Sequence, residues 1–244
     1  MKIVATIEAR MTSSRLPGKV LMPAGGVPML KHLVTRLEAV TSIQEIVLAT
    51  TNNKTDDPLV EFAKQENINY YRGSEDDVML RVIEAAESVN ADIVVEITGD
   101  CPIIDPQIVE QTIGMFKAHN ADYVSNAHIR SYPDGMDTQV FRLETLKRSA
   151  SMTDDSLDHE HVSLHIRNHH EIFSHVYLIA PPELHWPGLG LTLDEEDDYK
   201  LLKKIIEYFG KDNRLFSCLD TCRLLREKKE WIIINDHVQR KGDT

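Results

Sequence analysis

A loop near the start of the chain concentrates basic side chains, in a protein whose formal net charge is −12. Arg10, Arg15 and Lys19 lie within ten positions of one another. Hydroxyl groups and a glycine amide complete the loop, at Thr12, Ser13, Ser14 and Gly18. Such cations and N–H donors can surround a triphosphate and stabilise the charge that grows on departing pyrophosphate in a nucleotidyl transfer. The loop therefore indicates a triphosphate site, and a solvated basic loop is the alternative. Its pattern is neither a Walker P-loop nor G-x-G-x-x-G.

Two aspartates are candidates for holding a metal ion near that triphosphate. Asp100 follows Gly99 directly after an apolar segment, and Asp194 precedes an acidic run. Carboxylate oxygens are the ligands that Mg²⁺ prefers, usually together with several waters. A simple Gly-Asp turn and the acidic N-cap of a helix are the respective alternatives.

The first half of the chain alternates short apolar segments with segments of helical spacing. We expect strands at 2–7, 45–50, 69–71 and 92–98, and helices at 29–39, 58–66, 78–89 and 106–119. Such alternation predicts an α/β fold with a parallel sheet. Ligands in these sheets bind at the carboxyl ends of strands, so the loops that begin at Glu8 and Gly99 should form the site.

The second half is less regular. We expect strand pieces at 123–124 and 138–140 around the turn at 132–135, and a further strand at 173–180. Helices are expected at 158–168 and at 194–208, the latter with Asp194 near its N-cap. Because no linker or repeat interrupts the sequence, residues 1–244 are interpreted as one domain.

The basic loop also resembles a known signature. The segment from Arg10 to Lys19, RMTSSRLPGK, resembles the R-x-x-S-x-R-L-P-G-K motif of the sugar-acid cytidylyltransferases, which include the 3-deoxy-manno-octulosonate and acylneuraminate enzymes. The branch of spore coat polysaccharide biosynthesis protein F is the most similar. The resemblance implies a three-layer αβα fold of the nucleotide-diphospho-sugar transferase type, with a mostly parallel sheet, and commonly a homodimer.

The resemblance also assigns roles around the nucleotide. It implies that Arg15, Lys19 and Asp100 are catalytic and that Asp100 and Asp194 bind Mg²⁺ on the triphosphate. The implied nucleotide-binding residues are Ala9, Arg10, Ser14, Arg15, Lys19, Gly99 and Asp100. The family often has T-P-E-D around the late aspartate, whereas this chain has Glu195-Glu196-Asp197, which leaves the role of Asp197 open.

A third resembling segment lies in residues 122–190, the expected sugar-binding and dimerisation part. YPDGMDTQVF, at 132–141, is similar to the family's Y-P-x-G-x-D-x-E-V-F, and implies that Asp134 and Asp137 face the sugar; a Pro-Asp-Gly turn is the alternative. Gln139 stands where an acid is expected. His159-Glu160-His161-Val162 resembles R-E-H-V, which implies that Glu160 and His161 bind substrate.

The remaining histidines and cysteines suggest little further chemistry. His161, His165 and His169 would share one face of a continuous helix, so a zinc site is an alternative to a plain surface or interface helix. Cys101, Cys218 and Cys222 are too few for a disulfide framework, and the last two are expected to be core thiols. We therefore expect a reducing, cytoplasmic setting.

Composition excludes several classes of function. Hydrophobic residues make up 42% and charged residues 27%, a globular balance. The acidic net charge argues against nucleic-acid binding. No apolar run approaches the roughly 20 residues that span a bilayer, and the apolar N-terminus meets charge too soon for a signal peptide.

These observations together predict a magnesium-dependent nucleotidyltransferase that couples CTP to an acidic sugar and releases pyrophosphate. Two alternatives remain open at this stage. One is an enzyme that uses another nucleotide or a phosphorylated acceptor, and the other is a silent nucleotide-sugar-binding module.

Overall fold

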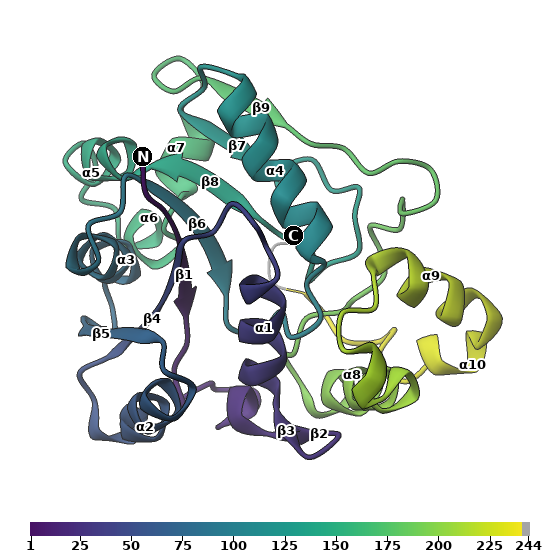
Figure 1. The fold of residues 1–244 in the computed structure, drawn as a ribbon. Coiled ribbons are helices and arrows are strands. Elements are labelled where there is room, and N and C mark those ends of the chain that lie inside the picture. The colour runs from purple at the N-terminus through teal and green to yellow at the C-terminus, as the bar shows by residue number, and fades with distance from the viewer. Residues whose placement is uncertain (241–244) are drawn as a thin grey trace.

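A seven-stranded sheet forms the centre of the computed structural model, which describes residues 1–240 (Figure 1). Its strand order is β5-β4-β1-β6-β8-β7-β9. The strands are β1 (Ile3–Glu8), β4 (Glu45–Thr51), β5 (Asn69–Gly73), β6 (Ile93–Thr98), β7 (Tyr123–Ser125), β8 (Gln139–Arg142) and β9 (His175–Tyr177). Only β8 in this sheet is antiparallel to its neighbours. The predicted mostly parallel sheet is therefore confirmed.

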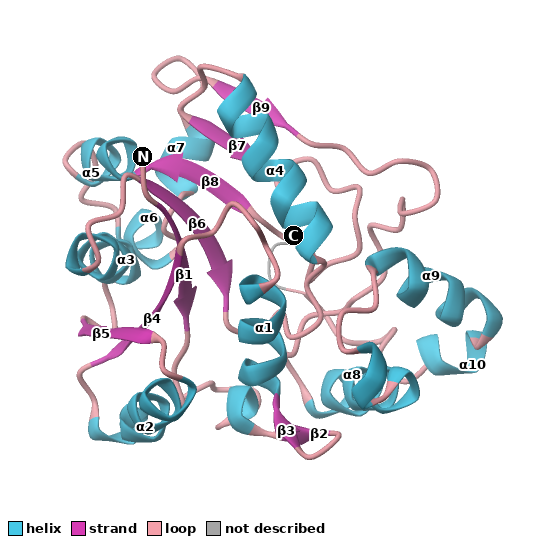
Figure 2. Cartoon of the chain, viewed as in Figure 1, coloured by secondary structure: helices cyan, strands magenta, loops and turns pink. Residues whose placement is uncertain are grey.

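Helices cover both faces of the sheet, which gives the predicted three layers (Figure 2). Alternate residues of β1 point to opposite faces: Ile3, Ala5 and Ile7 join one buried cluster and Val4 joins another. The first cluster contains residues of α1 (Met29–Glu38), α2 (Asp57–Glu66) and α4 (Pro106–Ala118). The second contains residues of α3 (Val78–Ser88), α5 (Leu143–Ala150) and α7 (Leu164–Asn168).

A third apolar cluster lies beside these layers and includes the buried Cys218 and Cys222, as expected of core thiols. It packs the C-terminal helices against a short hairpin. These elements are α8 (Glu196–Phe209), α9 (Cys218–Glu227), α10 (Lys229–Ile232), β2 (Pro23–Ala24) and β3 (Val27–Pro28). Short 3₁₀ helices complete the description, η1 (Lys19–Leu21), η2 (Lys54–Asp56) and η3 (Lys211–Asn213).

The expected helix at 158–168 is wrong as a continuous element. The structure has two short helices there, α6 (Ser156–Glu160) and α7, and Val162 between them has a φ of 41°. A β-branched residue in this left-handed region interrupts the helical path. His161, His165 and His169 therefore share no helix face, and within residues 1–240 no group of three or more metal-ligating side chains is placed to hold an ion. The zinc alternative loses its support.

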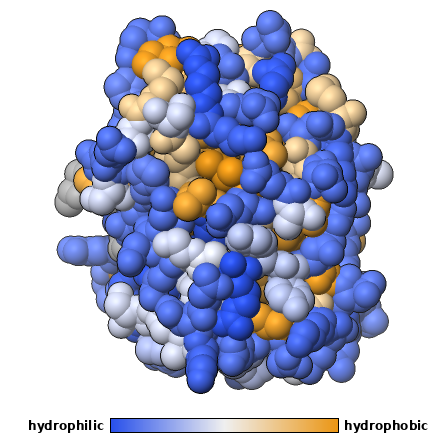
Figure 3. Space-filling model, turned by 90° about the vertical axis from the view of Figure 1, so that its left-hand side faces the viewer, coloured by the Kyte–Doolittle hydropathy of each residue, from blue (hydrophilic) through white to orange (hydrophobic). Residues whose placement is uncertain are grey.

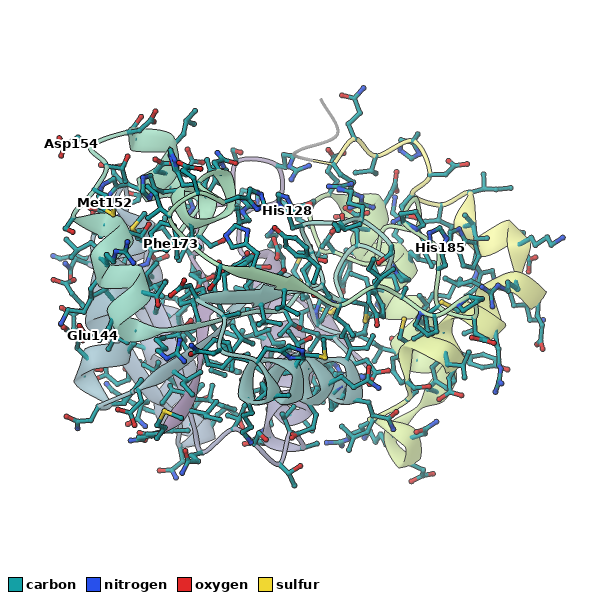
Figure 4. All side chains as sticks on the ribbon, turned by 90° about the horizontal axis from the view of Figure 1, so that it is seen from above. His128, Glu144, Met152, Asp154, Phe173 and His185 are labelled. Carbon is teal, nitrogen blue, oxygen red and sulfur yellow. The ribbon has the colours of Figure 1, made fainter. Side chains whose placement is uncertain are left out.

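The long connection after β9 crosses the molecule toward α8. In Figure 4, Glu144, Met152 and Asp154 lie at one end of the molecule, while His185, in this connection, lies toward the other. The face seen in Figure 3 is mostly hydrophilic, with small apolar patches. Across the described chain, every helix is too short or too polar to traverse a bilayer.

Candidate active site

The ends of β1 and β6 approach each other closely at the carboxyl edge of the sheet. The Gly99 N–H donates to the Glu8 carbonyl at 2.9 Å. A Cβ at Gly99 would lie 2.7 Å from that same oxygen and 3.0 Å from the Ala9 Cβ. Only glycine permits this approach, which carries Asp100 to the mouth of the sheet.

The basic loop then turns back over this edge through Gly18. Gly18 has a φ of 71°, a left-handed conformation that favours glycine, and its N–H donates to the Met11 carbonyl at 2.9 Å. The turn leads into η1, whose first residue is Lys19. The Lys19 ammonium donates to Asp100 Oδ2 at 2.9 Å and to Asp194 Oδ1 at 3.1 Å.

Arg15 joins the same cluster. Its Nη2 lies 2.7 Å from Asp194 Oδ1, and its Nη1 lies 3.7 Å from Glu195 Oε1. The structure thus brings together four predicted site residues, Arg15, Lys19, Asp100 and Asp194, from three distant segments of the chain.

Lys19 and Asp100 keep each other ionised. Burial alone would raise the pKa of Asp100, but the charge and hydrogen bond of Lys19, together with hydrogen bonds from Thr98 and the backbone, outweigh burial, and the pKa is lowered. Burial would lower the pKa of Lys19, but Asp100 and Asp194 outweigh it and the pKa is raised. Lys19 is therefore a cation and Asp100 an anion at neutral pH.

The other predicted nucleotide-binding residues lie beside this cluster. Arg10 pairs with Glu75, 3.2 Å away, and Glu75 also accepts a hydrogen bond from the Thr12 hydroxyl at 3.2 Å. Ala9 is buried against Gly99, and Ser14 is exposed in the loop. The structure therefore separates Arg10 from the aspartates, and the roles of Arg10, Ala9 and Ser14 stay predictions.

The turn that carries Asp134 packs directly against the segment before Asp194. The Asp134 N–H donates to the Leu189 carbonyl at 2.9 Å, and the Leu191 N–H donates to the Asp134 carbonyl at 2.8 Å. Gly135 has a φ of +99°, and a Cβ there would lie 2.7 Å from the Leu191 carbonyl carbon and oxygen. Glycine at position 135 thus lets the turn that carries Asp134 pack directly against the segment that leads to Asp194, the predicted metal ligand.

In the predicted sugar-binding segment, burial is the main cause of the raised pKa values of two aspartates. It raises the pKa of Asp134, and burial together with the nearby Asp134 raises the pKa of Asp137 to about 7. Exposed Glu160 and His161 lie at the end of α6, which packs against α3. Their role in binding substrate stays a prediction.

The hydrogen bonds of Gln139 explain why glutamine stands where the family motif has an acid. Its Nε2 donates to Glu96 Oε2 at 2.6 Å, and its Oε1 accepts from the Ser163 hydroxyl at 2.6 Å and from the Tyr123 hydroxyl. Glu96 is buried, and burial raises its pKa to about 7. A glutamate at position 139 would place a second carboxylate against Glu96, which glutamine avoids.

The structure adds two residues that the sequence analysis did not assign, Asp198 and Arg240. Asp198 is fully buried, and its Oδ2 accepts from the N–H groups of Asp194 and Glu195 at 3.1 and 2.9 Å. This contact forms part of the capping box that starts α8. By contrast, Asp197 pairs with Lys200 at 2.6 Å and lies 3.2 Å from the His237 ring on the surface, and a role for Asp197 in the site stays open.

Arg240 reaches the site from the far end of the chain. Its Nη2 lies 2.6 Å from Asp198 Oδ1, its Nη1 lies 3.8 Å from Asp194 Oδ2, and its Nε lies 3.8 Å from Asp134 Oδ2. Arg240 lies far from every recognised motif, so neither residue spacing nor hydrophobic periodicity could have predicted that it belongs to the site.

The two predicted metal ligands converge on one point. Asp100 and Asp194 come from different loops, yet one ammonium group contacts both carboxylates within 3.1 Å. Two carboxylates facing one position suit Mg²⁺, which is commonly held by one or two carboxylates together with phosphates and waters. The donor set therefore fits a magnesium ion bound jointly by protein and nucleotide.

Comparison with known proteins shows which family the chain resembles. A profile of the family described as "Cytidylyltransferase" matches residues 4–218. The spore coat polysaccharide biosynthesis protein SpsF of Bacillus subtilis is 32% identical over 216 residues, which is 86% of this chain and 88% of that protein. The 3-deoxy-manno-octulosonate cytidylyltransferase of Geobacter metallireducens is 31% identical over 133 residues, 53% of this chain and 48% of that protein.

A solved structure agrees along almost the whole length. The cytidylyltransferase from Leptospira borgpetersenii superposes with a TM-score of 0.90 at 31% identity, covering 95% of this chain and 97% of that one. The chain therefore belongs to the cytidylyltransferase family.

Proposed function

We propose that this protein transfers CMP from CTP to a hydroxyl of an acidic sugar, with Mg²⁺ and with release of pyrophosphate. One observation carries the proposal: Arg15 and Lys19 converge with Asp100 and Asp194 at the carboxyl ends of the strands. The acceptor class and a role in surface polysaccharide or glycan synthesis are supported by the names of the relatives.

The ion pairs of the cluster suggest how the site is loaded. Without nucleotide, Arg15 and Lys19 are neutralised by the two aspartates. A triphosphate offers them a replacement anion, so we expect both cations to turn to its oxygens and leave Asp100 and Asp194 to the metal. Bound there, Mg²⁺ would offset phosphate charge and favour departure of pyrophosphate.

The chain's own residues then position the reactants and stabilise charge. Arg15 and Lys19 bind the oxygens on which negative charge grows as the sugar hydroxyl attacks the α-phosphorus. Asp134 and Asp137 adjoin this position and are suited to accept hydrogen bonds from sugar hydroxyls. No covalent enzyme intermediate is required, so positioning and charge neutralisation supply most of the rate.

A substrate panel tests the proposal. CTP, GTP, UTP and ATP are each incubated with Mg²⁺ and a mixture of sugar acids, and both pyrophosphate and the nucleotide-sugar product are measured. We expect a CMP-sugar, and we expect Arg15→Ala to lower turnover by about 10² or more. A product from another nucleotide, or from a phosphorylated acceptor, supports that rival enzyme. Binding without pyrophosphate release supports a silent binding module.

We also propose that the enzyme is a homodimer formed through residues 122–190, which supply β7, β8, β9 and helices α5 to α7. Light scattering should then give twice the 27.8 kDa chain mass. A monomer mass at working concentration would contradict this part of the proposal.

A further inference from the structure

The last residues of the described chain return to the active site. After α10 the chain runs back toward the middle of the molecule (Figure 1). Asn235 donates to the Gly190 carbonyl at 3.0 Å, and Arg15 donates to the Gln239 carbonyl at 3.2 Å. Residues 235–240, the C-terminal segment, therefore contact both the basic loop and the segment that leads to Asp194.

Asp198 is the point on which this segment converges. Its carboxylate is fully buried and accepts four hydrogen bonds from the part of the chain that the structure describes. Two come from the backbone N–H groups of Asp194 and Glu195, and two come from the side chains of Asn235 and Arg240, at 2.8 and 2.6 Å. One carboxylate thus joins the C-terminal segment to the backbone of a predicted metal ligand.

Arg240 provides the positive charge at this point. Its side chain is only 9% exposed, and its Nη1 also donates to the Thr192 hydroxyl at 3.0 Å. The guanidinium lies over Gly190, where a Cβ would come within 2.6 Å of three of its atoms. Gly190 therefore leaves the space that Arg240 occupies, and Arg240 is built into the site and not merely resting on its surface.

We propose that Arg240 is a positioning residue for Asp194 and acts through Asp198. A buried carboxylate that loses the one ion-pair partner it has among residues 1–240 is strongly unfavourable, so Asp198 should not keep its orientation without Arg240. The N–H groups of Asp194 and Glu195 would then lose their shared acceptor. The Asp194 carboxylate would no longer be held opposite Asp100, and affinity for the divalent ion would fall.

This inference rests on the proposed function, and its test uses Mn²⁺ as the probe. The full chain is titrated with Mn²⁺ in the presence of a non-hydrolysable CTP analogue, and free Mn²⁺ is counted by electron paramagnetic resonance. We expect Arg240→Ala to weaken Mn²⁺ binding about tenfold and Arg240→Lys to restore most of the affinity. His237→Ala alters an exposed side chain of the same segment and should match wild type.

Hydrogen–deuterium exchange of the metal-free protein provides a second measurement. Exchange at the Asp194 and Glu195 amides should become at least tenfold faster in Arg240→Ala and stay unchanged in His237→Ala. Unchanged exchange, unchanged Mn²⁺ affinity, or an equal loss in His237→Ala would each overturn the inference.

The two proposals fail separately in this design. If wild type binds no Mn²⁺ with the CTP analogue, the proposed function fails, and amide exchange alone decides the role of Arg240. If Arg240→Ala does not fold, Arg240→Gln replaces it, because glutamine keeps a donor but not the charge. Equal amide exchange in the Gln and Lys variants would then overturn the inference.

Discussion

Lys19 neutralises two aspartates at once, so its removal should have two measurable effects. Lys19→Ala should lower kcat/KM by about 10² or more, because a cation that stabilises transition-state charge is lost. It should also make the melting temperature more dependent on Mg²⁺, because Asp100 loses its ammonium partner and only Arg15 and Arg240 still offset the charge of Asp194. Steady-state kinetics and thermal melts with and without Mg²⁺ measure both effects.

Lys200→Ala provides the matched control. Lys200 pairs with Asp197 on the surface, and such exposed pairs contribute at most about 1 kcal/mol. Near-normal turnover in Lys19→Ala, or the same loss in Lys200→Ala, would contradict the assignment.

Glu96 should make stability depend on pH. Its folded-state pKa is about 7 because it is buried, whereas an unfolded glutamate titrates near about 4.3. Between these values the folded state keeps a proton that the unfolded state has released, so the free energy of unfolding falls as pH rises. Glu96→Gln should remove this part of the fall, as measured by urea denaturation from pH 5 to pH 8.

The control for this prediction is Glu227→Gln, which changes an exposed carboxylate. Its stability should follow the wild-type curve in parallel. If Glu96→Gln also ran parallel to wild type, Glu96 would not be the group responsible.

At the level of residues, the sequence was most informative where charge and motif coincided. Arg15, Lys19, Asp100 and Asp194 were all predicted, and all four meet. Arg10 has the same charge and lies in the same loop, but the structure pairs it with Glu75. Spacing alone does not say which way an exposed loop turns each side chain, so this difference was not predictable.

At the scale of elements, the close contact between the ends of β1 and β6 depends on Gly99, which has no side chain. Gly99→Ala would place a Cβ 2.7 Å from the Glu8 carbonyl oxygen, which is backbone and cannot easily move. We expect a loss of about 1–3 kcal/mol in the free energy of unfolding and a larger loss of turnover, because Asp100 is displaced. Chemical denaturation and kinetics check both.

Gly114→Ala is the matched glycine variant. Gly114 lies within α4, and a Cβ there meets nothing within 4 Å. Alanine should stabilise this helix by about 0.5–1 kcal/mol and leave turnover unchanged. A similar destabilisation in both variants would show that the close approach at Gly99 is not the cause.

Elements with strong periodicity were predicted well, and those set by tertiary contacts were not. Helix α1 appears almost as expected, since Leu30, Leu33, Val34 and Leu37 all face one buried cluster. The break at Val162 was missed, because its backbone conformation opposes the preference of a β-branched residue. Helix α8 starts at Glu196, two residues later than expected, because Glu195 and Asp198 form the capping box.

At the scale of the whole molecule, ligand binding should stabilise the fold in a metal-dependent way. At about 100 times the dissociation constant, a ligand adds about 2.7 kcal/mol, which is roughly 5–10 °C for a chain of this size. CTP with Mg²⁺ should therefore raise the melting temperature by this amount, and EDTA should remove most of the increase. Differential scanning fluorimetry measures the shift.

Asp100→Asn tests whether the metal acts at the proposed position. Asparagine keeps the shape of the side chain but removes the charge that attracts the ion. The variant should respond to CTP equally with and without Mg²⁺. A full magnesium-dependent shift in Asp100→Asn would place the ion elsewhere.

The overall architecture was predictable to different extents in the two halves. Strands and helices alternate clearly up to residue 118, so the α/β class and the parallel sheet followed from pattern alone, whereas the three layers were implied by the family resemblance. The reversal of β8 was not predicted, because the direction of a strand depends on the path of its connections. The return of residues 235–240 is likewise visible only in three dimensions.

The reversed strand β8 has a consequence for how such enzymes can diverge. Because β8 runs against β6, with Gln139 opposite Glu96, the start of β8 lies at the same edge as the end of β6. Under the proposed function, the residues that contact the sugar thus come from a separate stretch of chain from those that bind the nucleotide. Substitutions in residues 132–141 could then change the sugar that is accepted while the nucleotide-binding half keeps its sequence, which gives this proposed function a route to new acceptors.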